Sequence, residues 1–175
     1  MNNTTKKITY SGVLLALCIL LPFLTFQQQQ LGNMFSLIHI PVLLCGFVCG
    51  WQYGLIIGLM APLLWHFLVG MPPFDAAVLM TVELAAYGAF AGILYKSMPK
   101  KNVSIYVTLI LSMVLGRLAY GAAGFAFAKL LNIDFTIALF ITKAFVNAVP
   151  GIICHIIVIP LIVIGLRKAK MMPDE

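Results

Sequence analysis

The stretch that decides the fold is residues 37–69, LIHIPVLLCGFVCGWQYGLIIGLMAPLLWHFLV. At about 1.5 Å per residue, this apolar run is too long for a single helix to cross the roughly 30 Å hydrocarbon core of a membrane. The chain must therefore turn inside it. Residues 49–54, CGWQYG, are the best place, because two glycines permit a tight turn and the Trp, Gln and Tyr suit the headgroup layer. We expect two short helices, at about 34–49 and 53–69.

The composition of the whole chain agrees with a membrane setting. Of the 175 residues, 62% are apolar and 9% are charged, whereas soluble domains carry about 25% charged residues. So few charges cannot cover a surface that meets water, and the exterior must face lipid. The same numbers exclude a disordered chain. The net charge of +6 comes from short basic clusters between apolar runs, which indicate membrane topology rather than a nucleic-acid-binding surface.

The rest of the chain supplies four more apolar runs. The first lacks a small-x-small cleavage site and is long enough to span, so we expect a retained helix rather than a signal peptide. It ends before Gln27 to Gln30, whose amides would lack partners in hydrocarbon. Pro72 and Pro73 break the chain again. The predicted fold is one all-α membrane domain, residues 1–175, with six transmembrane helices at about 8–26, 34–49, 53–69, 76–95, 104–131 and 137–166.

Basic residues test this assignment, because short cytoplasmic loops contain an excess of Lys and Arg. With six spans, one side holds only Lys129, at a helix end, and the other side holds the clustered cations Lys6, Lys7, Lys96, Lys100, Lys101, Arg167, Lys168 and Lys170. If residues 37–69 formed one helix, the cluster at 96–101 would move to the side opposite the N-terminus. We therefore predict that both termini lie in the cytoplasm.

Three charges fall inside the predicted spans, where each costs about 2.5–3.5 kcal/mol and needs a partner. They are Glu83, Arg117 and Lys143, all near the midplane or in the outer half. Each charged residue is followed three or four positions later by a polar residue, so that the two share one helix face; the polar residues are Tyr87, Tyr120 and Asn147. One reading is an internal salt bridge that holds three helices together. The other is a polar pocket open to the outside, whose two cations and one acid would suit a carboxylate, a phosphate or an electron-rich heterocycle.

Aromatic and histidine side chains are expected near the same surface. Trp65 and His66 close one predicted helix and His39 opens another. They could form a stacking platform for a flat ligand, and an interfacial aromatic belt explains Trp65 equally well. Two histidines without a nearby carboxylate or thiolate fall short of a metal site, and none is predicted. We interpret His155 as a hydrogen-bonded packing residue.

Other patterns carry less information about function. Small residues four apart permit close helix packing, and the pair Gly12 and Ala16 in the first helix could equally face another subunit. The four cysteines lie inside predicted helices and indicate no disulfide framework. The sequence contains no phosphate-binding loop, no Gly-x-Ser-x-Gly and no His-Glu-x-x-His motif. Any work driven by ATP would therefore come from a partner, and no catalytic residue is predicted.

A series of landmarks runs along nearly the whole chain: HIPVLL at 39–44, APLL at 61–64, GMPP at 70–73, EL at 83–84, YG at 87–88, GR at 116–117 and NAVPGI at 147–152. In this order they resemble the substrate-binding S component of energy-coupling factor (ECF) vitamin transporters. The resemblance implies six helices with cytoplasmic termini in a prokaryotic cell membrane. It also implies a binding site near the outer surface, formed by the first loop and the fourth to sixth helices.

The resemblance further implies partners and a substrate class. The partners would be an ECF transmembrane coupling subunit and two ABC ATPases, which use the ATP, so that this chain binds no cofactor itself. Gly12 and Ala16 match the small residues that contact the coupling subunit in the family. The substrate would be a water-soluble vitamin or related micronutrient. The landmarks are closest to the group for pyridoxine or hydroxymethylpyrimidine, and pantothenate, folate, niacin or a queuosine precursor are the alternatives.

The polar residues together with the resemblance suggest a binding and translocation subunit. Its expected substrate-binding residues are His39, Trp65, His66, Glu83, Tyr87, Arg117, Tyr120, Lys143 and Asn147. Two hypotheses of another class are an intramembrane enzyme that uses Glu83 and His66 as acid and base, and a membrane scaffold whose charges only bridge helices.

Overall fold

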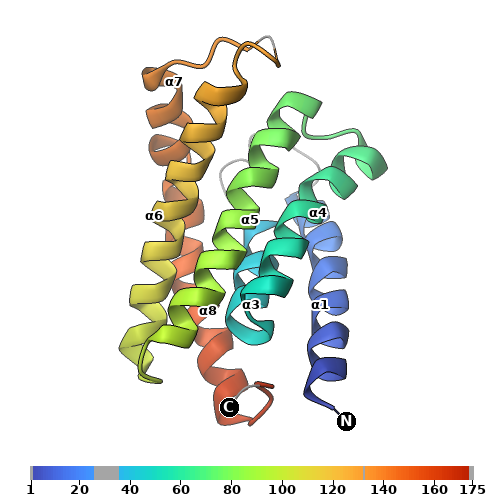
Figure 1. Cartoon of the computed structure of the whole chain (residues 1–175), viewed down its shortest axis with the longest axis vertical. Helices are drawn as coiled ribbons and strands as arrows, with labels where there is room; N and C mark the ends of the chain where they lie inside the picture. Colours follow the sequence, from blue (N-terminus) through green and yellow to red (C-terminus); the bar gives the residue numbers. More distant parts are fainter. Residues whose placement is uncertain (1, 26–35, 132, 174–175) are drawn as a thin grey trace.

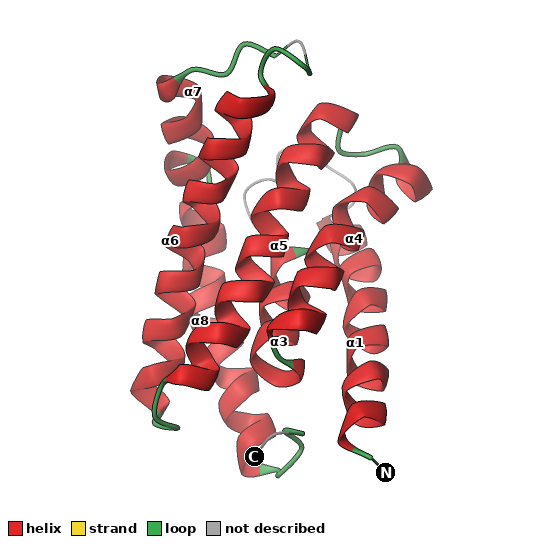
Figure 2. Ribbon diagram, in the orientation of Figure 1, coloured by secondary structure: helices red, strands yellow, loops and turns green. Residues whose placement is uncertain are grey.

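The computed structural model describes residues 2–25, 36–131 and 133–173, and among these residues it contains helices and no strand (Figures 1 and 2). The helices, in chain order, are α1 Asn3–Leu20, the 3₁₀ turn η1 Leu21–Thr25, α3 His39–Cys49, α4 Trp51–Val69, α5 Phe74–Ser97, α6 Asn102–Phe127, α7 Ile137–Ile141, the π turn η2 Thr142–Val146 and α8 Val149–Lys168. The all-helical fold predicted from the sequence is confirmed. The predicted loop at Gln27 to Gln30 lies outside the described residues.

In the part of the chain that the structure describes, five helices are long and apolar enough to cross a membrane: the segment Asn3–Phe23 and helices α4, α5, α6 and α8. The second expected span, 34–49, differs. Its first residues lie outside the described part of the chain, and α3 begins at His39. With 11 residues, α3 is about 16 Å long at 1.5 Å per residue, which is too short to cross alone. All of its residues are buried, so it is an internal helix of the bundle.

The turn expected inside residues 37–69 lies at Gly50. Its φ of 97° ends α3 and starts α4 one residue later, a conformation that glycine adopts without a Cβ clash. Helix α4 then passes α3 and α5 with backbones in close contact. A Cβ added at Gly54 or Gly58 would collide with the backbone of α5, and one added at Gly88 would collide with the backbone of Gly54. Gly46, Gly54 and Gly58, spaced at multiples of four, therefore serve internal packing, whereas Gly50 serves the turn.

The helix expected at 137–166 is not a single continuous α-helix. The structure divides it into α7, the π turn η2 and α8, with Asn147 and Ala148 between η2 and α8. Pro150 lies at the start of α8, where its missing N–H and fixed φ favour a helix beginning rather than an interior. The helix expected at 104–131 ends earlier, at Phe127.

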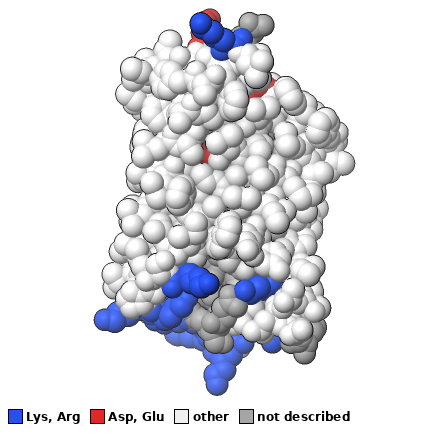
Figure 3. All heavy atoms as spheres, in the orientation of Figure 1, with Lys and Arg blue, Asp and Glu red and all other residues white. Residues whose placement is uncertain are grey.

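Most charged side chains lie at the two ends of the helix bundle (Figure 3). Both termini lie at the same end of the bundle, at the bottom of Figure 1. Figure 3 shows Lys and Arg side chains gathered at that end, a band almost without charge across the middle, and a small charged group at the opposite end. We call the two ends the basic end and the opposite end. Large apolar side chains are exposed along α6 and α8, as a lipid-facing surface requires.

Candidate functional site

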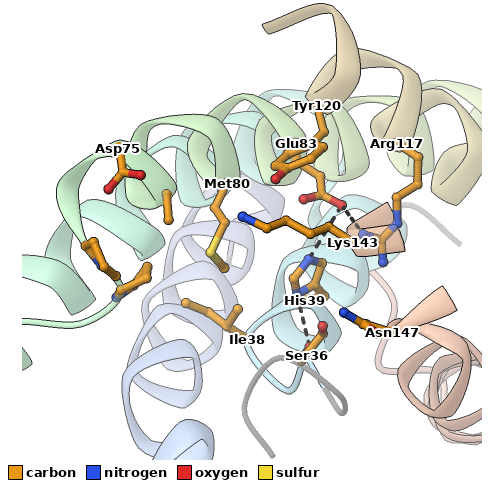
Figure 4. A pocket seen from close by; sticks show the side chains of 13 residues that line it. Ser36, Ile38, His39, Asp75, Met80, Glu83, Arg117, Tyr120, Lys143 and Asn147 are labelled. Carbon is orange, nitrogen blue, oxygen red and sulfur yellow. Dashed lines mark hydrogen bonds and ion pairs between the residues drawn. The ribbon is translucent and has the colours of Figure 1, made fainter. Parts of the chain in front are cut away.

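A cavity of about 310 Å³ opens in the half of the bundle away from the basic end (Figure 4). Its walls come from the start of α3, the loop before α5, the first half of α5, the middle of α6 and the η2 turn with Asn147. This volume lies at the lower end of the range for ligand sites, about 300–1,000 Å³. The three intramembrane charges predicted from the sequence, Glu83, Arg117 and Lys143, therefore line the same cavity.

The deep wall is built on a buried ion pair. Arg117 Nη1 lies 3.0 Å from Glu83 Oε1, and the Tyr87 hydroxyl donates a hydrogen bond of 2.8 Å to the same oxygen. Glu83 is 3% exposed, Arg117 9% and Tyr87 1%. Glu83 and Tyr87 are four residues apart on α5, so they share a face. The pair compensates both charges away from water, and removing either partner would leave a buried charge unpaired.

His39 lies beside this pair, at the first residue of α3. Its Nδ1 is 3.0 Å from the Ser36 carbonyl oxygen and its Nε2 is 3.9 Å from Glu83 Oε1, which is beyond hydrogen-bond distance. Nε2 is buried and has no hydrogen-bond partner among the described residues. His155 stacks on the His39 ring at 5.8 Å, and its Nε2 lies 3.3 Å from the same Ser36 carbonyl. His155 therefore supports His39 rather than lining the cavity, in line with a packing role.

The outer wall carries charges without ion pairs. Lys143, in η2, extends its side chain across the cavity toward Met80 in Figure 4 and forms no salt bridge with any described residue. Asp75, in the first turn of α5, lies on the other side of the opening. The sequence suggested two cations against one acid. Asp75 adds a second acid, so that Glu83 and Asp75 balance Arg117 and Lys143.

Six of the nine expected binding residues line the cavity: His39, Glu83, Arg117, Tyr120, Lys143 and Asn147. The other three do not. Tyr87 lies beneath the surface, where it holds Glu83. Trp65 is buried in the core, where Phe23 packs edge-on against its ring at 4.9 Å. His66 bonds the Pro72 carbonyl oxygen at 2.7 Å, so the structure does not bring it together with Glu83 as an acid and base pair.

Sequence reasoning missed several lining residues. Asp75 lies between the break at Pro72 and Pro73 and the predicted helix at 76–95, whereas the structure places it in the first turn of α5. Met80 precedes Glu83 by three residues and therefore shares its helix face. Ala76 lies in the first turn of α5, four residues before Met80. The others come from the residues before α3 and the loop before α5, where helical spacing gives no guide; they are Ser36, Ile38, Pro72 and Pro73.

A second cavity, of about 500 Å³, lies at the basic end among α1, the turn between α3 and α4, and the end of α5. It is larger, but its cations stand at helix ends, where membrane topology already explains them. Trp51, Gln52 and Tyr53 on its wall are residue types typical of the headgroup layer. The first cavity is the better candidate, because its charges lie between helix ends, where lipid gives them no other role.

Two further features concern partners and metals. Gly12 and Ala16 are exposed on α1, and a Cβ added at Gly12 would meet no atom within 4 Å. This face of α1 is therefore open to contact another helix. Within residues 2–25, 36–131 and 133–173, no group of three or more His, Cys, Asp or Glu side chains could hold a metal ion.

Comparison with known proteins gives one family. The model of the family described as "ECF transporter, substrate-specific component" matches residues 6–163. No curated protein and no solved structure matches the chain.

Proposed function

Because the chain belongs to the family of ECF transporter substrate-specific components, we propose that it binds a small water-soluble vitamin or related micronutrient in the 310 Å³ cavity and delivers it inward. The observation that carries this proposal is the cavity itself. It places a compensated buried ion pair at its base and a lysine without an ion pair at its opening, in a part of the bundle where lipid cannot stabilise charge.

The chain is a multi-pass membrane protein, and its topology is part of the proposal. We place both termini in the cytoplasm, since they lie together at the basic end of the bundle (Figures 1 and 3). Helices α1 and α4 run in the same direction in Figure 1, so the chain must return between them. The short helix α3 lies in that return. We propose that this whole return, and not α3 alone, makes the sixth crossing, so that the cavity opens toward the outside of a prokaryotic plasma membrane.

The partners are proposed from the family. An ECF transmembrane coupling subunit would dock on the open face of α1 around Gly12 and Ala16, and two ABC ATPases would supply the energy. Small residues allow the close backbone approach on which helix association in lipid depends. The exposure of both residues supports this assignment.

The proposed substrate is pyridoxine or hydroxymethylpyrimidine, with pantothenate, folate, niacin or a queuosine precursor as alternatives. The test is mass spectrometry of the ligand that the full chain retains through purification in mild detergent. Recovery of one such compound, in stoichiometric amount, would support the proposal. A chain that retains no ligand and shows no thermal shift with any water-soluble vitamin would contradict it.

The partners need a separate measurement. Affinity purification of the tagged chain from its native membrane should recover the coupling subunit and both ATPases. Recovery of the chain alone, at expression levels where the partners are present, would contradict the proposed assembly.

A further inference from the structure

We infer that the substrate carries no net charge near neutral pH and presents a hydrogen-bond donor to Glu83 and His39. This inference rests on the proposed function, because it concerns the same cavity. It divides the candidate substrates into two chemical classes.

The first argument is the charge balance of the lining. Glu83 and Asp75 oppose Arg117 and Lys143, so the four charged groups sum to zero. The charges of the deep pair compensate each other at 3.0 Å, although Arg117 Nε is buried without a hydrogen-bond partner among the described residues. Lys143 and Asp75 stand on different sides of the opening and form no salt bridge with the described residues (Figure 4). A ligand with a net charge would leave one charge uncompensated in a partly water-excluded site, whereas a neutral or zwitterionic ligand would not.

The second argument is the geometry of the two acceptors at the base. A carbonyl oxygen only accepts, so the hydrogen on His39 Nδ1 donates to Ser36. In the neutral ring, Nε2 is then an acceptor. It is buried without a hydrogen-bond partner among the described residues and lies 3.9 Å from Glu83 Oε1, a second acceptor. A ligand amino group placed between them would donate one N–H to each acceptor, and a ligand hydroxyl would donate its single hydrogen to one of them, at ordinary hydrogen-bond lengths of about 2.7–3.0 Å.

The third argument is size. A cavity of about 310 Å³ holds about ten water molecules at roughly 30 Å³ each. Ile38, Met80 and Pro72 give part of the wall an apolar surface. This space suits a single ring with short polar substituents. Pyridoxine and hydroxymethylpyrimidine are uncharged single rings with hydroxyl or amino donors, whereas pantothenate and nicotinate are anions, and folate is both larger and anionic.

Matched probes test the inference on the purified full chain in lipid nanodiscs at pH 7. Pyridoxine and 4-pyridoxate differ by a carboxylate in place of a hydroxymethyl group, and nicotinamide and nicotinate differ by a carboxylate in place of an amide. We expect the uncharged member of whichever pair binds to have a Kd at least tenfold lower by isothermal titration calorimetry. Equal affinity, or tighter binding of the anion, would overturn the inference.

A charge variant tests the cause. Asp75→Asn leaves the cavity with one excess cation, so it should shift the affinity ratio within the pair toward the anion by about fivefold or more. Asp134→Asn is the matched control, because Asp134 is exposed in the loop at the same end and does not line the cavity. An unchanged ratio in Asp75→Asn, or an equal shift in the control, would contradict the charge balance as the cause.

If neither pair binds, the ligand retained through purification is the probe. A retained compound with no net charge and a hydroxyl or amino donor supports the inference. A retained compound that is anionic or cationic at pH 7 overturns it but leaves the proposed function standing. Absence of any retained or added ligand contradicts the proposed function, and the inference fails with it.

Discussion

The two sides of the cavity are built in opposite ways. On one side, α3, α4 and α5 pack through glycines with their backbones in contact, and every residue of α3 is buried. On the other side, α7 has no buried residue and the η2 turn buries only Ala144. The first region holds Glu83 and His39 in place, whereas the second presents Lys143 from a loosely packed turn. The difference indicates a deep wall set by packing and an outer wall that can adjust around a ligand.

The largest effect on folding is expected from Gly88→Ala. An added Cβ would collide with the backbone of Gly54, so α4 and α5 would have to separate. Overpacking of this kind costs about 3 kcal/mol or more when the backbone cannot shift. That corresponds to a fall in Tm of roughly 6–12 °C. Thermal unfolding of the purified chain, followed by tryptophan fluorescence, measures it.

Gly165→Ala is the matched control for this variant. A Cβ at Gly165 meets no atom within 4 Å, and the residue lies inside α8. Replacing glycine by alanine in a helix interior should raise stability by roughly 0.5–1 kcal/mol. If both variants were tolerated equally, the contrast between the two regions would be wrong.

The next largest effect is expected at the ion pair. Arg117→Met leaves the buried Glu83 carboxylate without its cation and should cost about 3–5 kcal/mol of stability. Glu83→Gln in the same chain should restore part of that loss, because no buried charge then lacks a partner. A double-mutant cycle on the unfolding midpoint measures the coupling.

The same double variant separates the binding site from the scaffold hypothesis. If the pair only bridges α5 and α6, ligand binding should survive in the folded double variant. We expect binding to fall at least tenfold, because the base of the cavity loses its carboxylate and its guanidinium. Unchanged affinity in well-folded Glu83→Gln/Arg117→Met protein would favour the scaffold.

A smaller effect on stability is expected from Lys143→Met. Lys143 is exposed and forms no salt bridge with the described residues, so its removal should change stability by less than about 0.5 kcal/mol. Loss of one charge-assisted hydrogen bond to the ligand should raise Kd by roughly tenfold. Lys129→Met, also exposed but outside the cavity lining, should change neither quantity. Equal Kd values in the two variants would remove Lys143 from the site.

Gly12→Leu should have the smallest effect on the isolated chain, since its side chain would extend from an open face of α1. Its unfolding midpoint should match that of the unaltered chain. Copurification with the coupling subunit, and vitamin uptake by cells, should fall sharply because the helices can no longer approach closely. Normal assembly in this variant would place the docking surface elsewhere.

Part of the cavity was predictable from sequence for a clear physical reason. An Arg, Lys or Glu inside a membrane span has no role toward lipid, so Glu83, Arg117 and Lys143 could be singled out without coordinates. They do lie around one hollow. Asp75 could not be singled out in this way, because a charged residue at the start of a helix, next to a loop, is not forced to have a role inside the membrane.

The differences between the expected and the observed positions have equally specific causes. An aromatic residue near a helix end has the same sequence pattern in an interfacial belt, a binding site and a core, and Trp65 proved to be in the core. The apolar run at residues 37–69 showed that a turn was needed. Hydropathy did not reveal that the helix before the turn would be short and wholly enclosed. Proline at a helix start, as at Pro150, was the available sign that residues 137–166 would not form one helix.

The most direct test of the account is a structure of the purified chain with the ligand that it retains. We predict that the ligand lies in the cavity of α5, α6 and η2, with a donor group at Glu83 and His39 and with Lys143 closed over it. A ligand bound instead in the larger cavity at the basic end, beside Trp51 and Lys96, would contradict the assignment of the site.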